Sequence, residues 1–112
     1  MQRDSINKSQ DKNLLKQVCN AIERVDSSAE VILYGSRARG DANPESDYDL
    51  LILTESKVTL IREDDFRREL FPIELETGAV ITVILINKKD WKSALYSAML
   101  FYQNIKREGV RL

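Results

Sequence analysis

The feature that most constrains this chain is a glycine–serine turn between two short apolar runs. The first run, Val31–Tyr34, leads directly into Gly35 and Ser36, and the second run covers Leu50–Leu53. Four apolar residues bounded by glycine are typical of a buried strand, and glycine lets the backbone turn sharply and approach a ligand without a Cβ in the way. If a short helical turn begins at Ser36, its free N–H groups favour a phosphate. The stretch therefore predicts a strand, a phosphate-binding turn and a second strand.

Two aspartates directly precede the second run, in the segment Asp47-Tyr48-Asp49, which is expected to begin the second strand. Because side chains alternate along a strand, Asp47 and Asp49 are expected to share one face. If the two strands pair in antiparallel fashion, both carboxylates face the glycine–serine turn. Adjacent carboxylates repel each other unless a cation lies between them, and Mg²⁺ takes oxygen ligands, often some from substrate phosphates. Arg37 and Arg39 add permanent positive charge for a nucleotide phosphate.

This segment resembles the GSx10DxD signature of the DNA polymerase β-type nucleotidyltransferase superfamily, since ten residues separate the glycine–serine pair from Asp47. LYGSRARG and SDYDLLIL are similar to its minimal, stand-alone (MNT) members. The resemblance implies a minimal nucleotidyltransferase domain. The length of 112 residues suits one such domain over residues 1–112, and the polar residues 1–9 are expected to be flexible. The resemblance also implies an α/β (α+β) fold, in which helices flank a small mixed or antiparallel sheet of three or more strands. In such a domain Gly35 and Ser36 hold the nucleoside triphosphate, and Asp47 and Asp49 coordinate Mg²⁺ and are catalytic.

Active members of the superfamily typically add a third carboxylate from a neighbouring strand, and here Thr82 stands at the expected place. A threonine hydroxyl supplies no negative charge to a metal ion and takes no proton at neutral pH. Three interpretations stay open. Glu74 or Glu76 reaches the site from another backbone position, one Mg²⁺ on the two aspartates suffices, or the domain binds nucleotide and no longer transfers it.

The amino-acid composition excludes several classes of function and of site. Of 112 residues, 43% are hydrophobic and 31% charged, as in ordinary soluble domains. The net charge of -1 gives no indication of a basic surface that binds DNA or RNA. With no histidine and one cysteine, histidine acid–base chemistry and the usual zinc sites are unavailable. The polar N-terminal sequence lacks a signal-peptide core, and no apolar run approaches the roughly eighteen residues of a membrane span. We expect a cytoplasmic protein.

Apolar spacing predicts the remaining elements in the first two thirds of the chain. An amphipathic helix is expected from about Ser9 to Val25. A second is expected over about 60–70, with an interruption at Pro72 because proline removes a backbone N–H. Residues 73–77 alternate apolar and acidic side chains, which suits either a short strand or one helical turn. Residues 79–86 are rich in β-branched side chains and predict a central strand.

The C-terminal third predicts one long helix that begins after Asn87 and ends at Gly109. Its apolar stripe carries Trp91, Leu95, Ala98, Tyr102 and Ile105. Two further apolar side chains project from nearly the opposite side, where they are either tolerated surface or a partner contact. These are Tyr96 and Leu100.

Two functions follow from these features. The first is a Mg²⁺-dependent nucleotidyltransferase that moves a nucleoside monophosphate, AMP from ATP, onto a hydroxyl. The resemblance implies an acceptor on a second protein, such as a tyrosine of a HEPN-domain toxin partner, or on a homodimer mate. The alternative is a catalytically weakened nucleotide-binding antitoxin that acts by contact with its partner.

Overall fold

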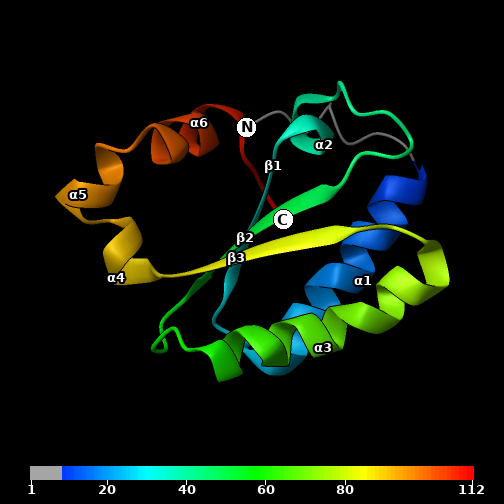
Figure 1. Cartoon of the computed structure of the whole chain (residues 1–112), viewed down its shortest axis with the longest axis horizontal. Coiled ribbons are helices and arrows are strands. Elements are labelled where there is room, and N and C mark those ends of the chain that lie inside the picture. Colours follow the sequence, from blue (N-terminus) through cyan, green and yellow to red (C-terminus); the bar gives the residue numbers. More distant parts are fainter. Residues whose placement is uncertain (1–8) are drawn as a thin grey trace.

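The computed structural model describes residues 9–112, and the predicted flexible segment 1–9 lies outside them except for Ser9. The chain builds a four-stranded sheet with helices over both faces (Figure 1). The elements in chain order are α1 (Ser9–Val25), β1 (Glu30–Tyr34), α2 (Ser36–Arg39), β2 (Tyr48–Thr54), α3 (Leu60–Thr77), β3 (Ile81–Asn87), α4 (Lys88–Trp91), α5 (Ala94–Ser97), α6 (Leu100–Glu108) and β4 (Val110–Arg111).

The sheet has the strand order β3-β2-β1-β4 and is mixed. β1 pairs with β2 and with β4 in antiparallel fashion, whereas β2 and β3 run parallel and are joined through α3. The β1–β2 register places Tyr34 opposite Asp49, and the β2–β3 register places Thr82 opposite the same aspartate. The α+β fold with a mixed sheet and flanking helices is therefore confirmed, and three strands converge beside Asp49.

Alternation along β2 divides the hydrophobic core between the two faces of the sheet. Leu50 and Ile52 are fully buried in the cluster that α1 and α3 cover. Leu51 and Leu53 point the opposite way, into a second cluster beneath the C-terminal helices. Asp49 precedes Leu51 by two residues and therefore lies on the second face. The C-terminal helices form an arc beside the sheet, away from α1 and α3 (Figure 1).

The predicted interruption at Pro72 is wrong, because α3 runs unbroken from Leu60 to Thr77. Proline costs an interior helix about 3 kcal/mol, but side chains on both sides of Pro72 hold the helix against the sheet. Leu70 and Ile73 are both buried, and Gly78 ends the helix in a left-handed conformation at φ 75°. Of the two alternatives for residues 73–77, the helical one is correct.

The single long C-terminal helix is also wrong, because the segment folds as three short helices, α4, α5 and α6. Asn87 caps α4 as predicted, through a side-chain bond from the Lys89 N–H at 2.9 Å. Ser93 then bonds the Asp90 carbonyl through its hydroxyl and caps α5, so the backbone leaves the helical path. The predicted stripe divides accordingly. Trp91, Tyr102 and Ile105 pack together, Leu95 and Ala98 are exposed, and the predicted outward Tyr96 is partly buried.

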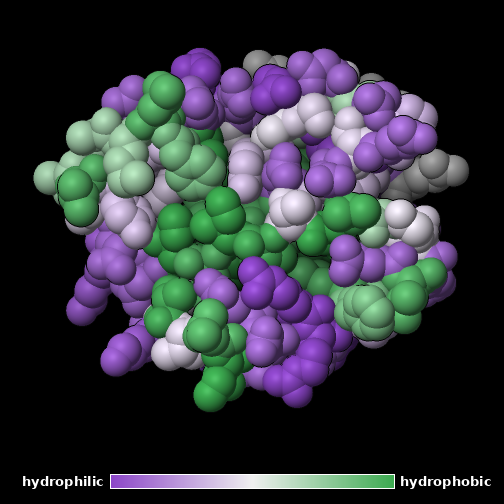
Figure 2. All heavy atoms as spheres, in the orientation of Figure 1, coloured by the Kyte–Doolittle hydropathy of each residue, from purple (hydrophilic) through white to green (hydrophobic). Residues whose placement is uncertain are grey.

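β3 is an edge strand, whereas its composition predicts a central one. It pairs only with β2, and most of its side chains are partly buried. Hydrophobic side chains gather over this part of the molecule in Figure 2, and Val80 and Ile84 are among the exposed ones. The other edge belongs to β4, a strand too short to show a period of two. Within residues 9–112, no helix is both long and apolar enough to span a bilayer.

Candidate active site

The glycine–serine turn forms as the sequence predicts. Gly35 follows β1 with φ 75° and ψ -159°, a conformation that L side chains rarely adopt, and α2 begins at Ser36. The Gly35 carbonyl accepts bonds from the Ala38 and Arg39 N–H groups at 3.1 and 3.0 Å. The N–H groups of Ser36 and Arg37, the first two residues of α2, come before these donors. They belong to the N–H groups at the start of a helix that have no partner within the helix. They supply hydrogen-bond donors for an anionic group at the end of β1.

Asp49 lies directly against this turn. A Cβ built on Gly35 would sit 2.3 Å from Oδ2 of Asp49 and 3.3 Å from its carboxyl carbon. That spacing is far shorter than any non-bonded contact, so the carboxylate occupies the space that a side chain at position 35 would need. The antiparallel register thus brings one predicted metal ligand to the predicted phosphate turn.

Thr82 completes the arrangement around Asp49 from the neighbouring strand. Its hydroxyl donates a 2.6 Å hydrogen bond to Oδ1 of Asp49. The carboxylate is therefore fixed, with Oδ1 engaged by Thr82 and Oδ2 directed at Gly35. Tyr34 is the third neighbour: burial, and secondly the charge of Asp49, raise the pKa of its phenol.

Asp47 differs from the prediction that both aspartates belong to the strand. β2 begins at Tyr48, so Asp47 lies one residue before it and is exposed.

Neither Glu74 nor Glu76 joins a cluster with the two aspartates. Glu74 accepts a 2.9 Å bond from the Ile81 N–H at the start of β3, and Glu76 is exposed on α3. Among residues 9–112, no group of three or more His, Cys, Asp or Glu side chains is arranged to hold a metal ion.

Arg37, predicted to bind nucleotide, makes contacts within the protein. Its guanidinium donates to the Ser46 carbonyl at 2.9 and 3.2 Å and lies 3.5 Å from Oδ1 of Asp11. It also stacks on the Tyr48 ring, 4.2 Å from the centroid. Only 9% of its side chain is exposed. The structure therefore gives Arg37 a positioning role, because it ties the loop before β2 to α1.

Arg39, the second predicted nucleotide-binding arginine, is exposed on the turn. Its guanidinium contacts Asp41 at 3.1 Å and Glu108 of α6 at 3.2 Å. It thus links α2 to the last helix while remaining accessible to a ligand.

Sequence reasoning missed two features of this site. One is Tyr34 beside Asp49, which the antiparallel register of the two apolar runs was sufficient to find. The other is the Tyr48 hydroxyl, which donates to Asp11 beneath the Arg37 guanidinium. Burial, and then this bond to Asp11, raise the pKa of Tyr48 to about 12. No local signal connects these residues, because Asp11 belongs to α1.

Comparisons with known proteins bear on the family and the fold of the chain. A family model described as "Nucleotidyltransferase domain" matches residues 12–110. A solved structure described as a "putative minimal nucleotidyltransferase" is 22% identical, with a TM-score of 0.58 over 90% of this chain and 94% of that one. A nucleotidyltransferase structure from Sulfolobus solfataricus, also assigned as "putative", is 19% identical, with a TM-score of 0.48 over 94% of this chain and 86% of that one. A search of curated proteins finds no match.

Proposed function

The chain belongs to the nucleotidyltransferase-domain family, and on that premise we propose that it transfers a nucleoside monophosphate, AMP from ATP, to a hydroxyl group. The observation that carries this proposal is the placement of Asp49 against Gly35, which joins a carboxylate to a phosphate-binding turn. The fold is similar to that of the solved structure described as a "putative minimal nucleotidyltransferase", with a TM-score of 0.58.

The donor set at the turn suits Mg²⁺. Oδ2 of Asp49 faces the turn while Thr82 engages Oδ1, and Asp47 offers a further, exposed carboxylate two residues earlier in the chain. Magnesium is usually held by one or two carboxylates together with substrate phosphates, so a third protein carboxylate is not required for binding. When bound, Mg²⁺ neutralises charge on the triphosphate.

The protein's own groups act on the nucleotide as follows. The first amides of α2 and the Ser36 hydroxyl hold the triphosphate, and Gly35 permits its close approach. Thr82 keeps Asp49 in one orientation toward the turn. The acceptor oxygen then forms a bond to the α-phosphorus, the bond to pyrophosphate breaks, and the acceptor proton leaves to solvent, because a threonine hydroxyl is no base at neutral pH.

The acceptor that we propose is a hydroxyl on a second protein, a tyrosine of a HEPN-domain toxin. The alternative acceptor is a hydroxyl on a second copy of this chain. The support is the resemblance of the Gly35–Asp49 segment to minimal, stand-alone nucleotidyltransferases. This assignment makes the chain the antitoxin of a pair.

The test incubates the purified chain with Mg²⁺, each α-labelled nucleoside triphosphate in turn, and its candidate partner. Label is expected on the partner with ATP, and it is lost in Asp49→Asn. Asp64→Asn, a position on α3 remote from the turn, is the matched control and retains transfer. Absence of labelled product with all four triphosphates contradicts the proposal.

One observation favours a second candidate, a nucleotide-binding module without transfer. The third carboxylate typical of active members is replaced by Thr82, whose hydroxyl already bonds Asp49. This candidate predicts ATP binding without pyrophosphate release, and partner binding that survives Asp47→Asn. Calorimetry with ATP, together with a pyrophosphate assay, separates the two.

A further inference from the structure

A second concave site lies on the same face of the sheet as Asp49, at the opposite end of the strands. Its volume is about 350 Å³, within the usual range for small-molecule sites. Glu30 and Leu53, which pair across β1 and β2, line it, whereas Tyr34 and Asp49 pair at the other end of this ladder. Four residues along a strand span about 13 Å. The pocket is therefore separate from the proposed transfer site.

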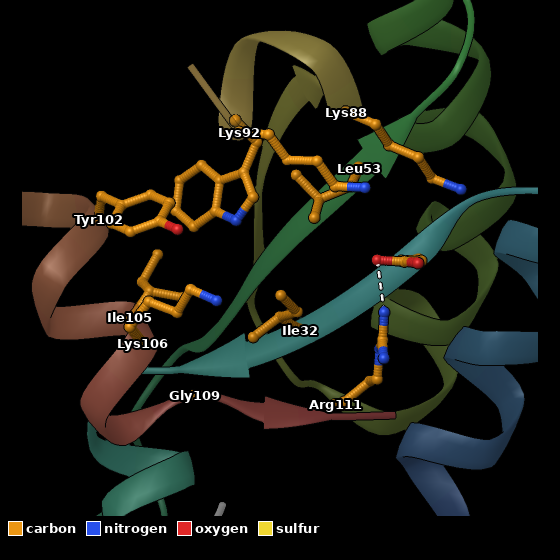
Figure 3. A pocket seen from close by; sticks show the side chains of 11 residues that line it. Ile32, Leu53, Lys88, Lys92, Tyr102, Ile105, Lys106, Gly109 and Arg111 are labelled. Carbon is orange, nitrogen blue, oxygen red and sulfur yellow. Dashed lines mark ion pairs between the residues drawn. The ribbon is translucent and has the colours of Figure 1, made fainter. Parts of the chain in front are cut away.

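The walls of this pocket are apolar and aromatic. Ile32 and Leu53 form the sheet side, and Tyr102 and Ile105 form the helix side (Figure 3). Trp91 of α4 also lines the pocket. The Trp91 and Tyr102 rings are in contact, with centroids 4.5 Å apart and planes tilted by 44°. A flat apolar group of a ligand can bury its faces against such walls, and aromatic contacts add to that burial.

The rim of the pocket is cationic. Lys88, Lys92, Lys106 and Arg111 contribute four positive charges, against the single carboxylate of Glu30. Arg111 pairs with that carboxylate at 2.7 Å, and Lys88 donates to a backbone carbonyl at 2.7 Å. Lys92 and Lys106 lie on the helix side, and in Figure 3 both amines extend over the pocket. The excess of positive charge favours an anionic group at the mouth.

We propose that this pocket binds an organic anion of about nucleotide size. Its flat apolar body packs against Trp91 and Tyr102, and its phosphate or carboxylate lies between Lys92 and Lys106. Apolar walls with a few charged groups at the opening are the usual construction of a small-ligand site. The site needs neither Mg²⁺ nor the two aspartates, so the inference is independent of the transfer reaction.

The chain reports on this site by itself, because Trp91 is its single tryptophan. The full chain in EDTA is titrated with AMP, phenyl phosphate and phenylacetate while Trp91 fluorescence and the indole N–H resonance are followed. We expect a saturable change with at least one of these anions. The phosphates and the carboxylate distinguish the two sources of negative charge. Adenosine and inorganic phosphate, which each carry half of the required chemistry, bind more weakly.

The decisive variant is Lys92→Ala/Lys106→Ala, which keeps the apolar walls. It is expected to weaken binding about tenfold or more, equivalent to about 1.4 kcal/mol. Lys12→Ala/Lys16→Ala removes two lysines from α1, on the other face of the sheet, and leaves binding unchanged. The inference is overturned if no anion perturbs Trp91, or if the two double variants bind equally well. Loss of nucleotide transfer in a separate assay bears only on the proposed function, because the titration contains no free metal ion.

Discussion

Thr82 donates a hydrogen bond of 2.6 Å to Oδ1 of Asp49 from the neighbouring parallel strand. Active members of the superfamily typically carry a carboxylate on that strand. The hydroxyl orients the aspartate without adding charge. Asp49 is therefore held by a neutral donor on this strand.

Thr82→Val removes the hydroxyl and preserves the shape of the side chain. We expect the free energy of unfolding to fall by about 1–2 kcal/mol, because a carboxylate loses a partly buried hydrogen bond. Urea unfolding measures this loss. Thr82→Ser retains the donor and is expected to unfold close to the wild type. Equal stability of the valine and serine variants contradicts the orienting role.

Thr82→Asp places a second carboxylate against Asp49. In EDTA the two like charges repel, so the melting temperature is expected to fall below that of Thr82→Asn, the uncharged control. A cation that binds only the folded state stabilises it. Mg²⁺ should therefore raise the melting temperature of Thr82→Asp more than that of the wild type or of Thr82→Asn. A magnesium response that is the same in all three proteins places the metal elsewhere.

Gly35→Ala introduces a methyl group where the Asp49 carboxylate lies, at a backbone position with φ 75°. We expect a loss of about 3 kcal/mol in the free energy of unfolding, from backbone strain together with displacement of the carboxylate. Gly78→Ala is the control without a clash, because Gly78 lies in the milder left-handed αL region, with φ 75° and ψ 1°, and a Cβ added there would meet nothing within 4 Å. It should lose only the strain, about 1 kcal/mol. Similar losses in the two variants argue against the clash.

Arg37→Met and Arg39→Met separate a positioning arginine from an accessible one. Arg37 is nearly buried against Asp11 and Ser46, so its loss should lower the free energy of unfolding by about 2 kcal/mol or more. Arg39 is exposed, and its loss should leave unfolding nearly unchanged while weakening nucleotide binding. Thermal melting and nucleotide titration of both variants check this. If Arg39→Met lowers stability and Arg37→Met weakens only nucleotide binding, Arg39 is the positioning arginine and Arg37 the one that contacts nucleotide.

Tyr48 should make the fold sensitive to alkali. Its pKa is raised from 10.0 to about 12, by burial and by its bond to Asp11. The folded state thus keeps a proton that the unfolded state loses above pH 10. The contribution of Tyr48 to the free energy of unfolding is fully present below pH 10. It is lost as the pH rises through about 12, and the loss is on the order of 1–2 kcal/mol. Tyr48→Phe should flatten this dependence in urea unfolding between pH 9 and 12. An unchanged slope refutes the assignment.

Local patterns predicted the parts of the site that are local. Gly35, the two apolar runs and the aspartates lie within 23 residues, and their antiparallel register follows once both strands are recognised. The Arg37 contact with Asp11 joins the turn to α1, so no spacing within the motif indicates it. The helix through Pro72 depends on burial of Ile73, and tertiary packing there outweighs the local preference.

The C-terminal third shows how a periodic pattern misleads. Trp91, Tyr102 and Ile105 do share a buried cluster, as helical spacing predicts. Trp91 reaches the cluster from α4, and Tyr102 and Ile105 reach it from α6, because Ser93 redirects the backbone between the two helices. Strand order is likewise a global property. The apolar composition of β3 indicates a central strand, but only the paired neighbours decide its place in the sheet.

Position 35 is constrained twice over, by the sign of its backbone torsion and by an oxygen from a strand that begins thirteen residues later. Shortening the side chain at position 49 relieves one demand and leaves the other, so no single second-site change compensates for a larger residue. A larger residue at position 35 would therefore need more than one compensating substitution elsewhere. In a saturation mutagenesis library under selection, it should tolerate the fewest replacements of any turn residue.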